Sequence, residues 1–121
     1  MKETHSTMLK RALLVVSLVC LALAGCSKSQ PDVRINVTMK KYKIEPAEIR
    51  VKKGQVVELT VTTTDVQHGF YVPDLGIREP VQKNRPAVIV FEAKRAGQYP
   101  VQCNIICGPG HDDMQAKIIV E

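Results

Sequence analysis

The chain of 121 residues is 45% hydrophobic and carries 17 basic against 12 acidic residues, a formal net charge of +5. This length gives room for one small domain with a single core. Part of the basic excess precedes an apolar run near the N-terminus, so the charge gives no support for nucleic-acid binding. The chain has four cysteines and no tryptophan.

The N-terminal segment has the features of a secretory signal peptide. Lysine and arginine residues precede an apolar run over residues 12–24, as in the charged and apolar regions of such a signal. As a helix the run would be about 20 Å long, against about 30 Å of bilayer hydrocarbon. A transmembrane span is therefore disfavoured.

The end of that run, Leu-Ala-Gly-Cys at 23–26, resembles the lipobox of bacterial lipoproteins. The resemblance implies that Cys26 becomes the lipid-modified N-terminus after cleavage. Its acyl chains would anchor the protein to a bacterial membrane outside the cytoplasm, on the periplasmic or outer face. The predicted division is a signal peptide at 1–25, the lipidated cysteine and a polar tether at 26–32, and one domain at 33–121.

Alternation of apolar and polar residues predicts strands through the rest of the chain. Shorter strands are expected over 49–51 and 70–72, and no stretch has a helical period. The pattern predicts an all-β, antiparallel sandwich or barrel. The alternating apolar positions are Val33, Ile35, Val37 and Met39; Val57, Leu59 and Val61; Ile89 and Phe91; and Met114, Ala116, Ile118 and Val120.

Two places interrupt the alternation. Residues 74–85 carry scattered charge and weak periodicity, so a long surface connection is expected there. Pro100 falls within a run in which Tyr99, Val101 and Cys103 alternate. Because proline cannot donate to a ladder, that strand is expected to lie at a sheet edge or to be bulged.

Two thiols, an imidazole and a thioether lie within twelve residues, at Cys103, Cys107, His111 and Met114. Soft sulfur ligands together with imidazole favour copper, and few other metals use a thioether. Cys103 is expected to end one strand and Met114 to open the next. The ligands would then lie on a loop at one end of the sheet, which His68, at another strand start, must also reach.

The pattern Cys-x3-Cys-x3-His-x2-Met after an upstream histidine resembles the copper A domain of cytochrome c oxidase subunit II and of nitrous oxide reductase, a cupredoxin. The resemblance implies a Greek-key sandwich or barrel and an electron-transfer centre of two copper ions. It also implies bridging thiolates at Cys103 and Cys107, one imidazole per copper at His68 and His111, and weak donors at Met114 and the Ile105 carbonyl.

The chain departs from oxidase subunit II in two respects. Ile105 stands where that subunit usually has a glutamate that binds magnesium at the contact with subunit I. The chain also lacks tryptophan, which that subunit uses at its entry point for electrons from cytochrome c. Stable docking into an oxidase is therefore not implied, and no catalysis is expected from this chain alone, although it could carry an oxidase-subunit name.

Other readings of the same residues remain open. A mononuclear blue-copper carrier needs two histidines, one cysteine and a methionine, and has no use for Cys103. A copper chaperone or storage protein would bind Cu(I) through the same side chains. A disulfide between Cys103 and Cys107 is the alternative for a metal-free form, and Met114 makes zinc a poor candidate.

The expected partners are a membrane, through the lipid anchor, and a redox protein such as a c-type cytochrome or a terminal oxidase or reductase. Nucleic acid is not expected. A group of basic residues could form a docking face for an acidic partner, but solvated strand edges explain them more simply. These residues are Lys40, Lys41, Lys43, Arg50, Lys52 and Lys53.

Overall fold

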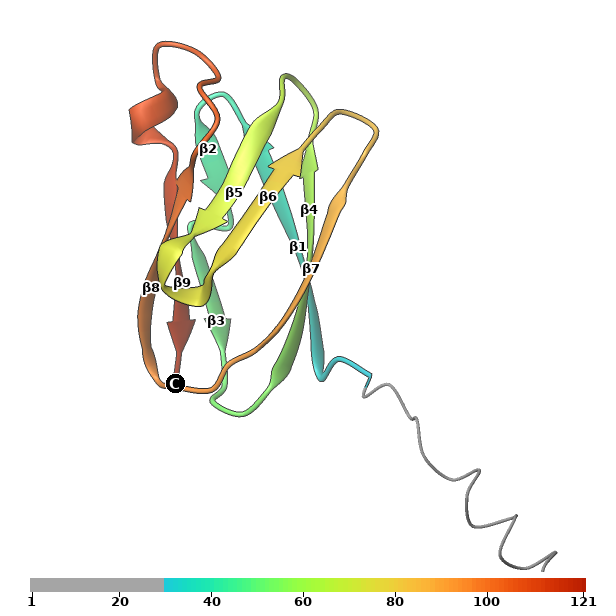
Figure 1. Ribbon diagram of the computed structural model, residues 1–121, viewed down its shortest axis with the longest axis vertical. Helices are drawn as coiled ribbons and strands as arrows, with labels where there is room; N and C mark the ends of the chain where they lie inside the picture. Colours follow the sequence, from blue (N-terminus) through green and yellow to red (C-terminus); the bar gives the residue numbers. More distant parts are fainter. Residues whose placement is uncertain (1–29) are drawn as a thin grey trace, which may run out of the picture.

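The computed structural model describes residues 30–121, so the predicted signal peptide and Cys26 lie outside the described residues. Strands and two short 3-10 turns make up the described part of the chain (Figure 1). The strands are β1 Val33–Lys40, β2 Lys43–Glu45, β3 Glu48–Val51, β4 Val56–Thr63, β5 His68–Val72, β6 Ile77–Val81, β7 Ala87–Glu92, β8 Gly97–Cys103 and β9 Gln115–Val120. The 3-10 turns are η1 Pro73–Leu75 and η2 His111–Asp113. Within residues 30–121, no helix has the length and apolar character needed to span a bilayer.

The strands form two sheets, which confirms the predicted all-β sandwich (Figure 1). One sheet has the strand order β2-β1-β4-β7 and the other the order β3-β9-β8-β5-β6. Most neighbours within a sheet are not consecutive in the sequence, because the chain crosses repeatedly between the sheets. These crossings are typical of Greek-key connections.

The core lies between the sheets and is built from the alternating apolar positions. In β4, Val57, Leu59 and Val61 have no exposed surface, whereas the residues between them are half-buried. The facing sheet contributes Phe70 and Val72, which are also fully buried. Burying side chains of this kind stabilises the fold by roughly 1.5–3 kcal/mol each.

The prediction of an antiparallel sandwich was wrong for two strand pairs. β1 runs parallel to β4, with Val33 opposite Val57, and β3 runs parallel to β9, with Ile49 opposite Ile118. Although a short turn containing Gly54 joins β3 to β4, these two strands enter different sheets. Alternation identifies the buried face of a strand but not the direction of its neighbour.

The expectation of a long connection over residues 74–85 was also wrong, because Ile77–Val81 forms β6 at the edge of the five-stranded sheet. Only the first and last residues of β6 are buried, so the strand shows no period-two pattern. Pro80 is tolerated because β6 has only β5 as a neighbour in the sheet.

Pro100 lies in a strand inside the sheet, which contradicts the expected edge position, but its local surroundings are those of an edge. β8 pairs with β5 only at Gln102 and Cys103. Opposite Pro100, the N–H of Lys117 donates to the Ala47 carbonyl at 3.0 Å, away from β8. The Pro100 nitrogen therefore faces away from β9, toward the side where β5 has no paired residue, and no ladder bond is lost.

Four connections gather at one end of the sandwich, which we call the site end (Figure 1). They are the β1–β2 turn at 41–42, the β4–β5 turn at 64–67, the β6–β7 turn at 82–86 and the β8–β9 loop at 104–114. The C-terminus and the turns at 52–55 and 93–96 lie at the opposite end. Every predicted ligand belongs to the site end.

Leu59→Ala tests the contribution of the core far from that end. Removing a fully buried leucine side chain should lower the free energy of unfolding by about 2–5 kcal/mol, because it leaves a cavity between the sheets. Urea unfolding followed by circular dichroism measures the change. Val90→Ala, at a position 58% exposed, is the control and should change the free energy by less than about 0.5 kcal/mol. Equal effects of the two substitutions would contradict the assigned core.

Candidate metal site

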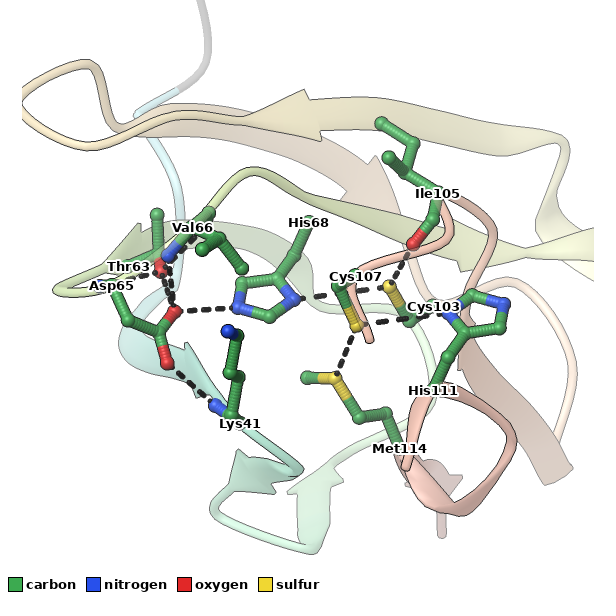
Figure 2. A network of polar contacts seen from close by, with 10 residues as sticks. All are labelled: Lys41, Thr63, Asp65, Val66, His68, Cys103, Ile105, Cys107, His111 and Met114. Carbon is green, nitrogen blue, oxygen red and sulfur yellow. Dashed lines mark hydrogen bonds and ion pairs between the residues drawn. The ribbon is translucent and has the colours of Figure 1, made fainter. Parts of the chain in front are cut away.

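The predicted ligands converge at the site end (Figure 2). His68 opens β5 and Cys103 ends β8, and these neighbouring antiparallel strands place Phe70 opposite Cys103. The buried His68 side chain is thereby brought beside Cys103. The loop that follows β8 turns back over this pair and brings in the remaining donors.

The two thiols and His68 form the tightest group. Both sulfur atoms and one His68 nitrogen lie within 4.8 Å of one another. Cys103 Sγ is 4.0 Å from Nδ1 of His68 and 3.2 Å from the carbonyl oxygen of Ile105. A His/Cys/Cys site able to hold a metal ion is therefore present.

Cys107 has a second pair of donors beside it. Its Sγ is 3.7 Å from Nδ1 of His111 and 3.4 Å from Sδ of Met114. The donors thus form two sets of three, each with a thiol, an imidazole and a weaker donor. Figure 2 shows the two thiols between the two imidazoles.

Both cysteines are free thiols, with Cys103 buried and Cys107 half-buried. Burial, followed by the neighbouring Cys103 sulfur, raises the pKa of Cys107 to about 11, because both disfavour the thiolate. A bound cation would supply the opposite charge and hold the thiol deprotonated. The disulfide of the metal-free alternative is not formed in this structure.

Asp65 fixes the orientation of His68, and sequence reasoning missed it. Its Oδ1 lies 2.7 Å from Nε2 of His68, which leaves Nδ1 directed at Cys103 (Figure 2). Its Oδ2 accepts a 2.7 Å hydrogen bond from the backbone N–H of Lys41. Burial raises the pKa of the Asp65 carboxyl, but hydrogen bonds from Lys41, His68, Val66 and Thr63 outweigh burial and lower it overall.

The available sequence signal for Asp65 was its position three residues before His68, in the turn that precedes β5. The aspartates nearest to the ligands in the sequence, Asp112 and Asp113, lie on η2 and are exposed. A carboxylate that orients a metal-binding imidazole typically contacts its second nitrogen. Only the fold reveals that Asp65 occupies that place.

Tyr42 supports the ligand loop and was also missed. Its half-buried ring lies against Gly108 and Gly110, so closely that a Cβ on either glycine would overlap the ring. Gly108 also has a φ of 144°, a conformation that side chains disfavour. With Pro109, these two glycines make up the segment between Cys107 and His111, so the ring determines how near that segment approaches the β1–β2 turn.

Gly69 has a comparable role on the other side of the site. A Cβ at Gly69 would overlap the Asn104 side chain, and the Asn104 N–H donates to the Gly69 carbonyl at 3.3 Å. The residue after His68 therefore has to be small for the residue after Cys103 to lie against it. This close approach keeps the two donors together.

This β-sandwich carries thiol, imidazole and thioether donors at one end. It is therefore a soft-metal-binding β protein, and these donors favour copper. The cupredoxin-like domain model matches residues 13–120. The chain therefore belongs to the cupredoxin-like domain family, as the sequence predicted.

The relatives include the two kinds of protein that the ligand pattern resembles. Cytochrome c oxidase subunit 2 of Thermus thermophilus is 34% identical over 77 residues, which cover 64% of this chain and 57% of the relative. Nitrous-oxide reductase of Cupriavidus necator is 26% identical over 102 residues, or 81% of this chain and 16% of the relative. The chain spans about half the length of the Thermus oxidase relatives that it matches.

Solved structures share the fold. The periplasmic domain of subunit II of cytochrome oxidase from Bradyrhizobium japonicum superposes with a TM-score of 0.71 at 23% identity, covering 78% of this chain and 88% of that one. Auracyanin A, a blue copper protein from Chloroflexus aurantiacus, gives a TM-score of 0.61 at 21% identity, covering 74% and 98%. The same sandwich therefore occurs in a cytochrome oxidase subunit II domain and in a blue copper protein.

Asp65→Asn should weaken copper binding by about 10–100-fold, because the charged group that orients His68 is lost while the shape is kept. Competition with a chromophoric Cu(I) chelator measures the affinity. Asp112→Asn removes an exposed carboxylate beside the same loop and should leave the affinity unchanged. Equal affinities of the two variants would show that Asp65 does not support the site.

Tyr42→Ala should loosen the ligand loop in the metal-free protein, since the Tyr42 ring supplies the nearest contacts to both Gly108 and Gly110. The amides of His111 and Asp113, which donate to the carbonyls of Gly108 and Gly110, should exchange about tenfold faster, corresponding to roughly 1.4 kcal/mol of lost local stability. Tyr42→Phe keeps the ring and should exchange like the unmodified protein. If the alanine variant also keeps its protection, the ring does not hold the loop.

Proposed function

We propose that this protein is an extracytoplasmic electron carrier with a binuclear copper centre of the copper A type. The observation that carries the proposal is the pair of three-donor sets around two adjacent thiols. Two ions that share both thiolates would use all six donors. A mononuclear blue-copper site would use four donors and leave Cys103 and the Ile105 carbonyl without a role.

In this proposal Cys103 and Cys107 would hold two copper ions between them, and His68 and His111 would each supply one imidazole to one of the ions. Met114 and the Ile105 carbonyl are the weak donors. When bound, such a copper pair shares one electron between two metals, so that each changes its geometry little on reduction. Fast electron transfer follows from that small change.

The chain's own contribution is to hold the donors still and to bury three of them, His68, Cys103 and Met114. His68 is fully buried and fixed by Asp65, and Met114 is only 1% exposed. Their positions are set by packing within the protein rather than by the metal, which favours the same arrangement in both oxidation states. Preorganisation of this kind lowers the cost of each electron transfer.

The relatives support a respiratory role and the kind of partner. They include proteins named cytochrome c oxidase subunit 2 and a nitrous-oxide reductase. We therefore propose a c-type cytochrome, or a terminal oxidase or reductase, as redox partner. The lipobox adds membrane attachment through Cys26, with the folded domain at 33–121 outside the cytoplasm.

A copper chaperone or storage protein is the second candidate. It is favoured by one observation, that His68, Cys103 and Cys107 alone form a compact three-donor group suited to a single Cu(I). Copper content separates the two functions. The carrier of electrons should bind two coppers per chain with one unpaired electron spread over both, whereas a chaperone should bind one Cu(I) and give no paramagnetic signal.

Cys103→Ser tests the bridging role directly. It should abolish the signal of an electron shared over two coppers, because a serine hydroxyl does not replace a bridging thiolate. Electron paramagnetic resonance and copper analysis of the loaded protein measure this. Survival of the binuclear spectrum would rule out the bridging assignment, and an unmodified protein with a single blue-copper signal would favour the mononuclear alternative.

A further inference from the structure

We infer that the site end docks a soluble electron-transfer protein whose own docking face is acidic around an apolar centre. The inference rests on the proposed function and specifies the partner that the centre would serve. It comes from the surface around the ligand loop, where one apolar side chain and four basic side chains are exposed.

Ile106 supplies the apolar centre of this face. It is 87% exposed, more than the other two large exposed hydrophobic residues of the described chain, Val88 and Val90 on β7. It lies between Ile105, whose carbonyl contacts Cys103 Sγ, and Cys107. A partner that covers Ile106 therefore lies one residue from Ile105, which contacts the Cys103 thiol, and one residue from Cys107. This closeness shortens the path for an electron.

The basic side chains come from two turns that the fold brings to the same end. The β1–β2 turn is held at the site by the hydrogen bond from Lys41 N–H to Asp65. The β6–β7 turn is held there because Val81 pairs with His68 and Gln82 bridges to Arg85. Exposed basic side chains on or next to these turns are Lys41, Lys43, Lys83 and Arg85.

These four side chains have no ion-pair partner within residues 30–121, whereas neighbouring Lys40 pairs with Glu45 at 3.1 Å. The acidic groups of the site end are Asp112 and Asp113 on η2 and the hydrogen-bonded Asp65. Glu45 on β2 pairs with Lys40, and exposed Glu79 on β6 lines one pocket together with Arg85. In Figure 1, η2 lies at one side of the site end and the β6–β7 turn at the other. The β6–β7 turn is therefore basic on the side away from η2, whereas the β1–β2 turn lies near η2, because Tyr42 packs on Gly110, the residue that precedes η2.

This distribution selects a partner by charge. An apolar contact surrounded by charged residues is the usual anatomy of a transient protein interface. Unpaired basic groups attract an acidic surface and orient it during the encounter, whereas they repel a basic one. Lys52 and Lys53 belong to the β3–β4 turn at the opposite end and take no part in this face.

Two forms of one protein provide the probe, namely a basic cytochrome c and the same cytochrome c with its lysines succinylated. The haem is common to both, and the charge of the docking face is inverted. Titration of the metal-free, isotope-labelled domain at low ionic strength, followed by amide chemical shifts, reports binding without requiring copper. The succinylated form should shift the amides of the two basic turns and of Ile106, and the native form should bind at least about tenfold more weakly.

Lys41→Glu with Lys83→Glu should reverse this preference. The matched control is Lys52→Glu with Lys53→Glu, which makes the same change of net charge at the opposite end and should alter either affinity by less than about twofold. The preference for the succinylated form should also shrink as the salt concentration rises, because the Debye screening length falls to about 3 Å at 1 M. If a charge-reversed variant fails to fold, the binding of both cytochrome forms to the unmodified domain, measured over a range of salt concentrations, still tests the inference.

Tighter binding of the native cytochrome at the site end, or binding of the succinylated form elsewhere, would overturn the inference. Equal effects of the two double substitutions would overturn it as well, since they would show that net charge alone acts. These results are independent of copper loading. A protein that docks the succinylated form but lacks the shared-electron signal would contradict the proposed function and leave the docking face established.

Discussion

The pairing of β5 with β8 is the constraint on which the site depends. One antiparallel ladder, with Phe70 opposite Cys103, sets a buried imidazole on the first strand beside a buried thiol at the end of the second. The core residues that hold this ladder also bury these two donors. Stability and chemistry therefore have a common origin, and a change in register would move both donors at once.

The remaining donors depend on contacts between turns rather than on ladders. The backbone of Lys41 holds Asp65, and the next residue, Tyr42, covers the two loop glycines. A single turn thus touches the His68 side of the site and the His111 side. Because the loop itself contains little regular structure, its shape depends on such contacts and on the two glycines that permit them.

The sequence was most informative where one residue type has one physical meaning. Alternating valines and isoleucines identified the core strands, and thiols spaced with histidine and methionine identified the donor groups. Neither pattern contains strand direction, so the parallel pairs of β1 with β4 and β3 with β9 were missed. β6 was missed because an edge strand buries few residues. Tyr42 acts on residues distant in the sequence. Asp65 lies only three residues before His68, but the contact between their side chains depends on the turn that precedes β5.

The hydrogen bond that holds Asp65 comes from the main-chain N–H of Lys41, and the Lys41 side chain takes no part in it. Any residue other than proline offers the same N–H at that position. Charge at this surface position can therefore change over evolution while the orientation of His68 is preserved. A substitution at position 41 can therefore change which partner the protein binds, through the side chain, without disturbing the metal site, which depends on the main-chain N–H.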